Sequence, residues 1–238
     1  MRADDQEVDP GGPRNRALVV RLALAGGRPV SASTLIDDLW GLDVPADAVN
    51  ALQSVVSRTR RRLPPGALVS TPAGYVLHGA NVDAHELEHL VSTGRAVEAL
   101  SLWRGDALVD VIEFPFAPSA ATRLEELRLT AVESAVAARV RTDPTVIAEL
   151  AQLTADHPYR DGFWRLYLTA LAAQGRANEA LAAYDRLRTE LADAGHRAVA
   201  GAAGTARLDP ARRAARAPQP PGVAGRPELV RRPRTGDR

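Results

Sequence analysis

Arginine, serine and amide side chains gather on one face of a helix that the sequence predicts over residues 47–63. Apolar side chains recur there at steps of three and four residues, which marks the buried stripe of a helix. The stripe consists of Leu52, Val55, Val56, Thr59 and Leu63. The opposite face carries Asn50, Ser54, Ser57, Arg58 and Arg61. Arginine can pair with guanine through two hydrogen bonds, and asparagine or serine can bond other base edges, so this face suits the major groove of DNA. The alternative is an ordinary surface helix with a solvated run of arginines.

A second group of residues has the pattern of a metal site. His85, Glu86 and His89 form the motif H-E-x-x-H. On a helix, this motif puts both histidines on one face and offers the glutamate as the general base of a zinc hydrolase. Nothing in the sequence marks Glu113 as a third ligand, and so short a motif can arise by chance. We therefore expect a solvated helix here, with no metal, no other cofactor and no catalytic residue.

The composition favours closely packed helices. Of the 238 residues, 45% are hydrophobic but only 4% are aromatic, so alanine, leucine and valine must fill the core. The chain has no cysteine, which excludes disulfides and cysteine-ligated zinc. The sequence contains neither a signal peptide nor an apolar run of membrane-spanning length, and we expect a cytoplasmic protein.

The net charge of +1 hides an uneven distribution. Residues 1–80 carry 9 arginines against 8 carboxylates, residues 81–200 carry 12 against 18, and residues 201–238 carry 9 against 3. The amino-terminal part is therefore not broadly basic. Any DNA binding there must come from locally placed arginines, and its phosphate affinity should be modest and sensitive to salt.

Three helices and a hairpin are expected after an irregular start. Residues 1–12 are acidic, rich in glycine and without periodicity, so we expect them to be disordered. The predicted helices cover residues 13–25, 33–40 and 47–63, with Pro13 in the first turn of the first and Ser33 as the cap of the second. Two β-prone runs flank Pro72, Ala73 and Gly74, which predicts a hairpin over residues 68–79. Three helices followed by a hairpin is the order of a winged helix-turn-helix.

The residues from Arg14 to Tyr75 resemble the DNA-binding domain of the AfsR/SARP regulators. The resemblance lies in four motifs in the right order: R-x-R-A-L, L-I-D-D-L-W-G, N-A-L-Q-x-x-V-S-R-x-R-R-x-L and P-x-G-Y. The family has a winged helix of the OmpR type, an output domain also found in phosphorelays. The resemblance implies that Arg58 reads bases and that Asn50, Gln53, Ser57 and Arg61 contact bases or phosphates.

The sequence departs from this family in two places. The family has a β-sheet before its first helix, which residues 1–12 cannot supply, so we expect a truncated amino terminus. Many relatives also have an arginine in the wing just before the Pro-Gly-Tyr turn, reaching toward the DNA. Thr71 takes that place here, so it is the residue of the wing that we assign to DNA binding.

The second half of the chain is expected to be a helical repeat domain. Helices are predicted over residues 83–91, 96–103 and 120–141, and the aromatic side chains of residues 113–118 should pack against the last of them. The spacing of Trp164, Leu168, Leu171, Gly175, Ala180, Tyr184 and Leu187 matches a tetratricopeptide (TPR) repeat, and a 34-residue period leads back to Val146, Leu150 and Leu153. This half resembles the bacterial transcriptional activator domain of SARP proteins. The concave face of such repeats usually binds a protein partner.

We therefore predict a mainly α protein, with a winged helix-turn-helix over residues 13–80 and a TPR-like α-helical repeat domain over residues 81–200. Residues 201–238 should be a disordered basic tail. The resemblance implies a sequence-specific activator of secondary-metabolite genes, which binds direct repeats in promoter DNA, forms a homodimer there and contacts RNA polymerase. One alternative is a TPR-like interaction module whose damaged winged helix no longer binds DNA. The other is a zinc hydrolase, which depends on HELEH alone.

Overall fold

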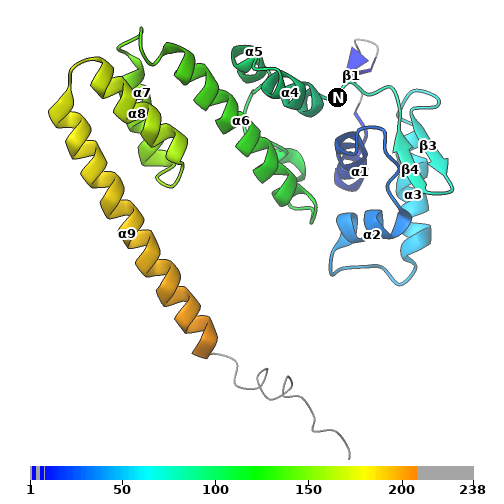
Figure 1. The fold of residues 1–238 in the computed structure, drawn as a ribbon. Coiled ribbons are helices and arrows are strands. Elements are labelled where there is room, and N and C mark those ends of the chain that lie inside the picture. Colours follow the sequence, from blue (N-terminus) through cyan, green and yellow to red (C-terminus); the bar gives the residue numbers. More distant parts are fainter. Residues whose placement is uncertain (1, 4–5, 8, 208–238) are drawn as a thin grey trace, which may run out of the picture. The chain divides into compact units, whose positions relative to one another are not determined.

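The fold of the chain is mainly helical (Figure 1). The computed structural model describes residues 2–3, 6–7 and 9–207, with side chains from residue 9 to residue 192. Clustering of close residues gives one compact unit up to Tyr184 and a second from Asp185 onward. The expected fold class, a winged helix-turn-helix followed by helical repeats, is confirmed. The boundaries that we assigned to the domains stay predictions.

The first three helices form where the local signals predicted them. They are α1 (Pro13–Leu24), α2 (Ala32–Trp40) and α3 (Ala48–Arg60). Proline occupies the first turn of α1, where its missing N–H costs nothing. The predicted cap of α2 was wrong by two residues: Ser31, not Ser33, accepts a hydrogen bond from the backbone N–H of Thr34. Residues 2–3 and 6–7 form two short paired strands, β1 (Arg2–Ala3) and β2 (Gln6–Glu7), which the sequence did not predict.

The predicted hairpin is confirmed as β3 (Leu68–Thr71) paired with β4 (Gly74–Leu77). A third extended segment joins it, because Val30 and Tyr75 exchange two backbone hydrogen bonds of 2.9 Å. Gly74 lies at this crossing with φ of +134°, and a Cβ atom there would be 2.0 Å from the Val30 carbonyl oxygen. Only glycine fits this position, so the glycine of the P-x-G-Y motif allows the wing to lie close to Val30, two residues before α2.

The core of the winged helix includes side chains from much later in the chain. It is built from the inner faces of α1, α2, α3 and the hairpin, and it also contains Val111, Phe114, Phe116 and Ala117. Val111 ends a short 3₁₀ helix, η1 (Val109–Val111). The prediction that the aromatics of residues 113–118 pack against the following helix was therefore wrong. They cover the apolar faces of α1 and α2, so these faces are buried.

A second core joins three helices: α4 (Asp83–Ser92), α5 (Ala96–Ser101) and α6 (Ala117–Arg139). Its fully or largely buried members are small or medium aliphatic residues, namely Ala84, Leu87, Leu90, Ala96, Ala99, Leu124 and Ala131. The buried residues of α6 include Leu124, Ala131 and Val136, whereas Ala138 is exposed.

The repeat region consists of α7 (Val146–Asp156), α8 (Asp161–Ala173) and α9 (Ala177–Arg207). The repeat positions Val146, Leu150, Trp164 and Leu171 are at most 1% exposed, as the period predicts. Tyr184 is half exposed and does not take part in the core. The helix α9 continues to Arg207, past the predicted start of the disordered tail, and residues 208–238 lie outside the described part.

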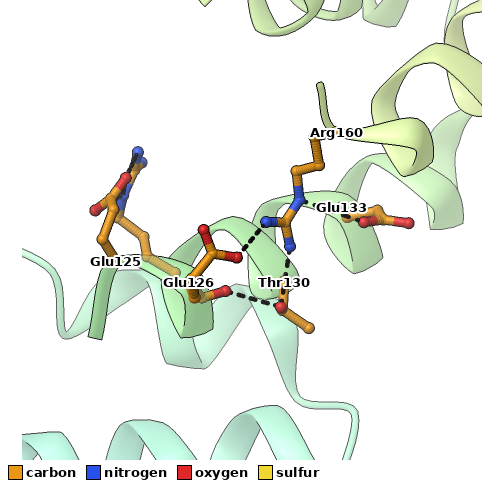
Figure 2. Close-up of polar contacts among 6 residues, drawn as sticks. Glu125, Glu126, Thr130, Glu133 and Arg160 are labelled. Carbon is orange, nitrogen blue, oxygen red and sulfur yellow. Dashed lines mark hydrogen bonds and ion pairs between the residues drawn. The ribbon is translucent and has the colours of Figure 1, made fainter. Parts of the chain in front are cut away.

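Arg160, the residue before α8, links this helix to α6 (Figure 2). Its guanidinium donates to Glu126 at 2.7 Å and to Thr130 at 3.1 Å, and its Nε atom lies 3.6 Å from a Glu133 oxygen. The Glu133 carboxylate also occupies the space where a side chain of Gly162 would begin. These contacts hold the pair of α7 and α8 against α6.

Among the residues that the structure describes, no helix combines the length and apolar character needed to cross a lipid bilayer.

Candidate nucleic-acid interface

Residues of α3 and its immediate flanks determine where this helix begins and which side of it is buried. The opposite side is left as a polar face. Asp47 caps it, accepting a hydrogen bond of 3.1 Å from the backbone N–H of Asn50. The buried face consists of Leu52, Val55, Val56 and Thr59, and Leu63 is buried just beyond the helix end. The Thr59 hydroxyl donates to the Val55 carbonyl at 2.9 Å, so this polar side chain is satisfied inside the core. The predicted stripe is confirmed at every position.

All six residues that we assigned to DNA on this helix are exposed, and they share the outer face of α3: Asn50, Gln53, Ser54, Ser57, Arg58 and Arg61. The Asn50 amide also donates to the capping carboxylate of Asp47, which orients it at the start of the helix. The Arg61 Nε atom donates to the Ser57 carbonyl at 3.4 Å. The Arg58 guanidinium has no carboxylate within ion-pair distance among the described residues. The arrangement offers hydrogen-bond donors along about three turns of an exposed helix.

Arg60 and Arg62, which flank Arg61 in the sequence, have partners within the protein. Arg60 donates through Nε to the Leu68 carbonyl at 2.9 Å and through a terminal nitrogen to the Ser70 hydroxyl at 3.0 Å. Arg60 therefore connects the hairpin to α3. Arg62 lies 3.7 Å from a carboxylate oxygen of Asp9. Of the three consecutive arginines, only Arg61 has no carboxylate or hairpin partner in the part of the chain that the structure describes.

Thr71 closes the turn of the wing. Its hydroxyl donates to the Gly74 carbonyl at 3.0 Å, and its side chain is half-buried. The residue thus stabilises the hairpin, and its assignment to DNA binding stays a prediction.

Sequence reasoning missed Arg14 and Asn15, which lie near the arginines of α3. Both belong to the first turn of α1, and they line the same surface hollow as Arg58 and Arg61. The Arg14 guanidinium stacks over the Trp40 ring at 5.5 Å from its centroid. The R-x-R-A-L motif contains both residues, but nothing in its spacing indicates which part of α3 they approach.

The H-E-x-x-H motif lies on α4. His85 is half-buried, with its ring against Gly26, and His89 is exposed. Within residues 9–192, no three histidine, aspartate or glutamate side chains are grouped so that they could hold a metal ion. Glu113 lies elsewhere, at the rim of the hollow beside α3.

Comparison with known proteins shows one family over most of the chain. The family model of the "Bacterial transcriptional activator domain" matches residues 82–200. The regulatory protein AfsR of Streptomyces coelicolor is 35% identical in a match of length 213, which covers 80% of this chain but 21% of AfsR. The regulatory protein DnrI of Streptomyces peucetius is 34% identical in a match of length 217, which covers 77% of this chain and 78% of DnrI.

A solved structure shares the fold as well. Mycobacterium tuberculosis EmbR, in complex with a low-affinity phosphopeptide, matches with a TM-score of 0.65 and 33% sequence identity. The match covers 80% of this chain and 56% of that EmbR chain. This chain thus spans about a fifth of the length of AfsR and little more than half of that of EmbR.

Proposed function

The chain belongs to the AfsR/SARP family of bacterial transcriptional regulators, and we propose that it is a sequence-specific DNA-binding activator. The observation that carries this proposal is the outer face of α3. Its six assigned side chains are all exposed, whereas the opposite stripe is buried in the core. A polar helix face with arginine in its second half is the element that winged helix-turn-helix proteins insert into the major groove.

The charges around α3 support a division of roles along the helix. Arg58 lies mid-face beside Ser54 and Ser57 and has no carboxylate partner, so it is free to pair with a guanine edge. Arg61 lies one turn further on, where a groove-bound helix approaches the sugar-phosphate backbone. Arg60 is used for the wing and Arg62 is partly neutralised by Asp9, so neither is assigned to base reading.

The repeat domain suits the activating part of the function. We propose that it contacts RNA polymerase while the winged helix holds a promoter, with two copies on direct repeats. The target genes are proposed to be those of secondary metabolism, as the AfsR/SARP family implies. No catalytic role is proposed for any residue.

A site can be selected from a pool of random duplexes with the full chain, and its affinity compared with that of a scrambled duplex by fluorescence anisotropy. Arg58→Ala should cost about 1–3 kcal/mol on the selected duplex and relax the preference at one base pair. Arg61→Ala should weaken both duplexes evenly and lower the salt slope by about one. Arg62→Ala should change both affinities less, because Asp9 lies 3.7 Å from this arginine and partly neutralises it. Equal, small effects of all three substitutions would contradict the proposal.

A further inference from the structure

A hollow of about 1030 Å³ opens beside the polar face of α3, between the first turn of α1 and the end of α2. Four of its lining residues are arginines: Arg14, Arg58, Arg61 and Arg62. Two carboxylates, those of Asp43 and Glu113, line it as well. Four positive charges against two negative ones leave the hollow with an excess of positive charge. Such a surface favours an anion over a neutral ligand.

Three of these arginines carry no compensating charge nearby. Arg14, Arg58 and Arg61 have no carboxylate within ion-pair distance in the described part of the chain, whereas Arg62 lies 3.7 Å from Asp9. Arg14 is exposed, and its stacking over Trp40 holds the guanidinium at the hollow without neutralising it. The cations are therefore positioned but unpaired.

Asn15 adds an amide group to the lining of the hollow. This residue is only 8% exposed, and it lines the hollow. Its backbone N–H bonds to the Gly12 carbonyl, but its side-chain amide has no hydrogen-bond partner among the described residues. Among the described residues, only the Arg160 Nε atom is both buried and without a hydrogen-bond partner, so the Asn15 amide remains accessible from solvent. An amide donor beside three guanidiniums matches the oxygens of a phosphate group, which accept charge-assisted hydrogen bonds.

We propose that this hollow holds a backbone phosphate of bound DNA, with Arg14 and Asn15 as its contacts from α1. The inference rests on the proposed function, because Arg58 and Arg61 belong both to the hollow and to the face of α3 assigned to the groove. A duplex that receives this face must bring one strand past the edge of α3, where the hollow opens. Arg14 and Asn15 then fix the position of α3 in the groove without reading sequence.

The test uses the full chain, the selected duplex and a scrambled duplex, titrated over a salt series by fluorescence anisotropy. Each phosphate contact contributes about 0.9 to the slope of log K against log salt, so Arg14→Ala should lower the slope by about 0.9 and both affinities roughly eightfold at 0.1 M salt. Asn15→Asp keeps the shape of the side chain but repels a phosphate, and it should weaken both duplexes at least as much. Arg14→Lys should keep most of the slope. Arg141→Ala removes an exposed arginine from the other domain and is the matched control.

The outcomes separate this inference from the proposed function. If Arg14→Ala and Asn15→Asp bind both duplexes like Arg141→Ala, with an unchanged slope, the phosphate contact is refuted, whereas a lost preference in Arg58→Ala would still support base reading by α3. If inorganic phosphate raises the melting temperature of the wild type but not of Asn15→Asp, and DNA affinity is unchanged, the hollow binds a free anion and the inference is also wrong. A chain that binds no duplex refutes both. Because Arg14 is exposed, its variants keep the test valid even if Asn15→Asp unfolds.

Discussion

Replacing Phe114 by alanine should destabilise the winged helix, although this residue comes after α4 and α5 in the chain. Phe114 is 7% exposed and lies in the core cluster built on α1, α2 and α3. Truncation of a buried phenylalanine costs about 3–5 kcal/mol, because burial of the ring is lost and a cavity remains. Native stability is only about 5–15 kcal/mol, so the loss is a large fraction of it. The same change at Ile112, which is 45% exposed in the same segment, should cost about 0.5 kcal/mol or less.

Hydrogen exchange of the full chain, followed by mass spectrometry, measures this effect where it occurs. Phe114→Ala should speed exchange of the backbone amides in α1 and α3, whereas Ile112→Ala should leave them at the wild-type rate. A fall in protection confined to α5 and α6 would refute the reasoning, since it would mean that the phenylalanine stabilises only its own domain. Equal protection in the two variants would refute it too.

The other predictions concern stability and metal content. A fragment of residues 13–80 lacks the side chains that cover α1 and α2, so it should show no cooperative thermal transition above room temperature, and a sharp one would contradict this. Gly74→Ala should cost about 2 kcal/mol or more in chemical denaturation because its Cβ would overlap the Val30 carbonyl, whereas Gly66→Ala has positive φ but open space and should cost less. The dialysed protein should hold no stoichiometric zinc by elemental analysis, and zinc that is lost in His85→Ala would overturn this.

The elements that sequence reasoning predicted well are those whose signals are local. Asp47 caps α3 and the three-and-four spacing of its apolar residues defines the buried stripe, so both the helix and its exposed face follow from about sixteen consecutive residues. The cap of α2 shows where local signals are ambiguous, because two serines stand two positions apart. Pairing of Val30 with Tyr75 decides between them, since it makes Ser31 the last extended residue before the helix.

The position of residues 111–117 could not be predicted in this way. The run V-I-E-F-P-F indicates a turn with buried aromatics, but it does not indicate which of two hydrophobic cores receives them. That choice depends on contacts between residues far apart in sequence, such as Phe114 with the cluster around Leu39. We assigned the aromatics to the nearest helix, and the structure places them in the core of the preceding domain. We therefore expect the stability of the winged helix to depend on a segment beyond the predicted boundary at residue 80.

The same distinction applies to the candidate site. The six exposed residues of α3 were predictable because one helix determines which of its side chains face outward. The contribution of Arg14 and Asn15 was not, because it depends on how α1 lies against α3, and that packing is set by buried residues such as Leu18 and Leu52. The packing of the core therefore determines the position of the hollow. Phe114 and Pro115 both line the hollow, with Phe114 in the core and Pro115 against Gly41. Phe114→Ala should therefore shift the hollow and alter DNA affinity, although Phe114 is not among the residues that we propose to contact DNA.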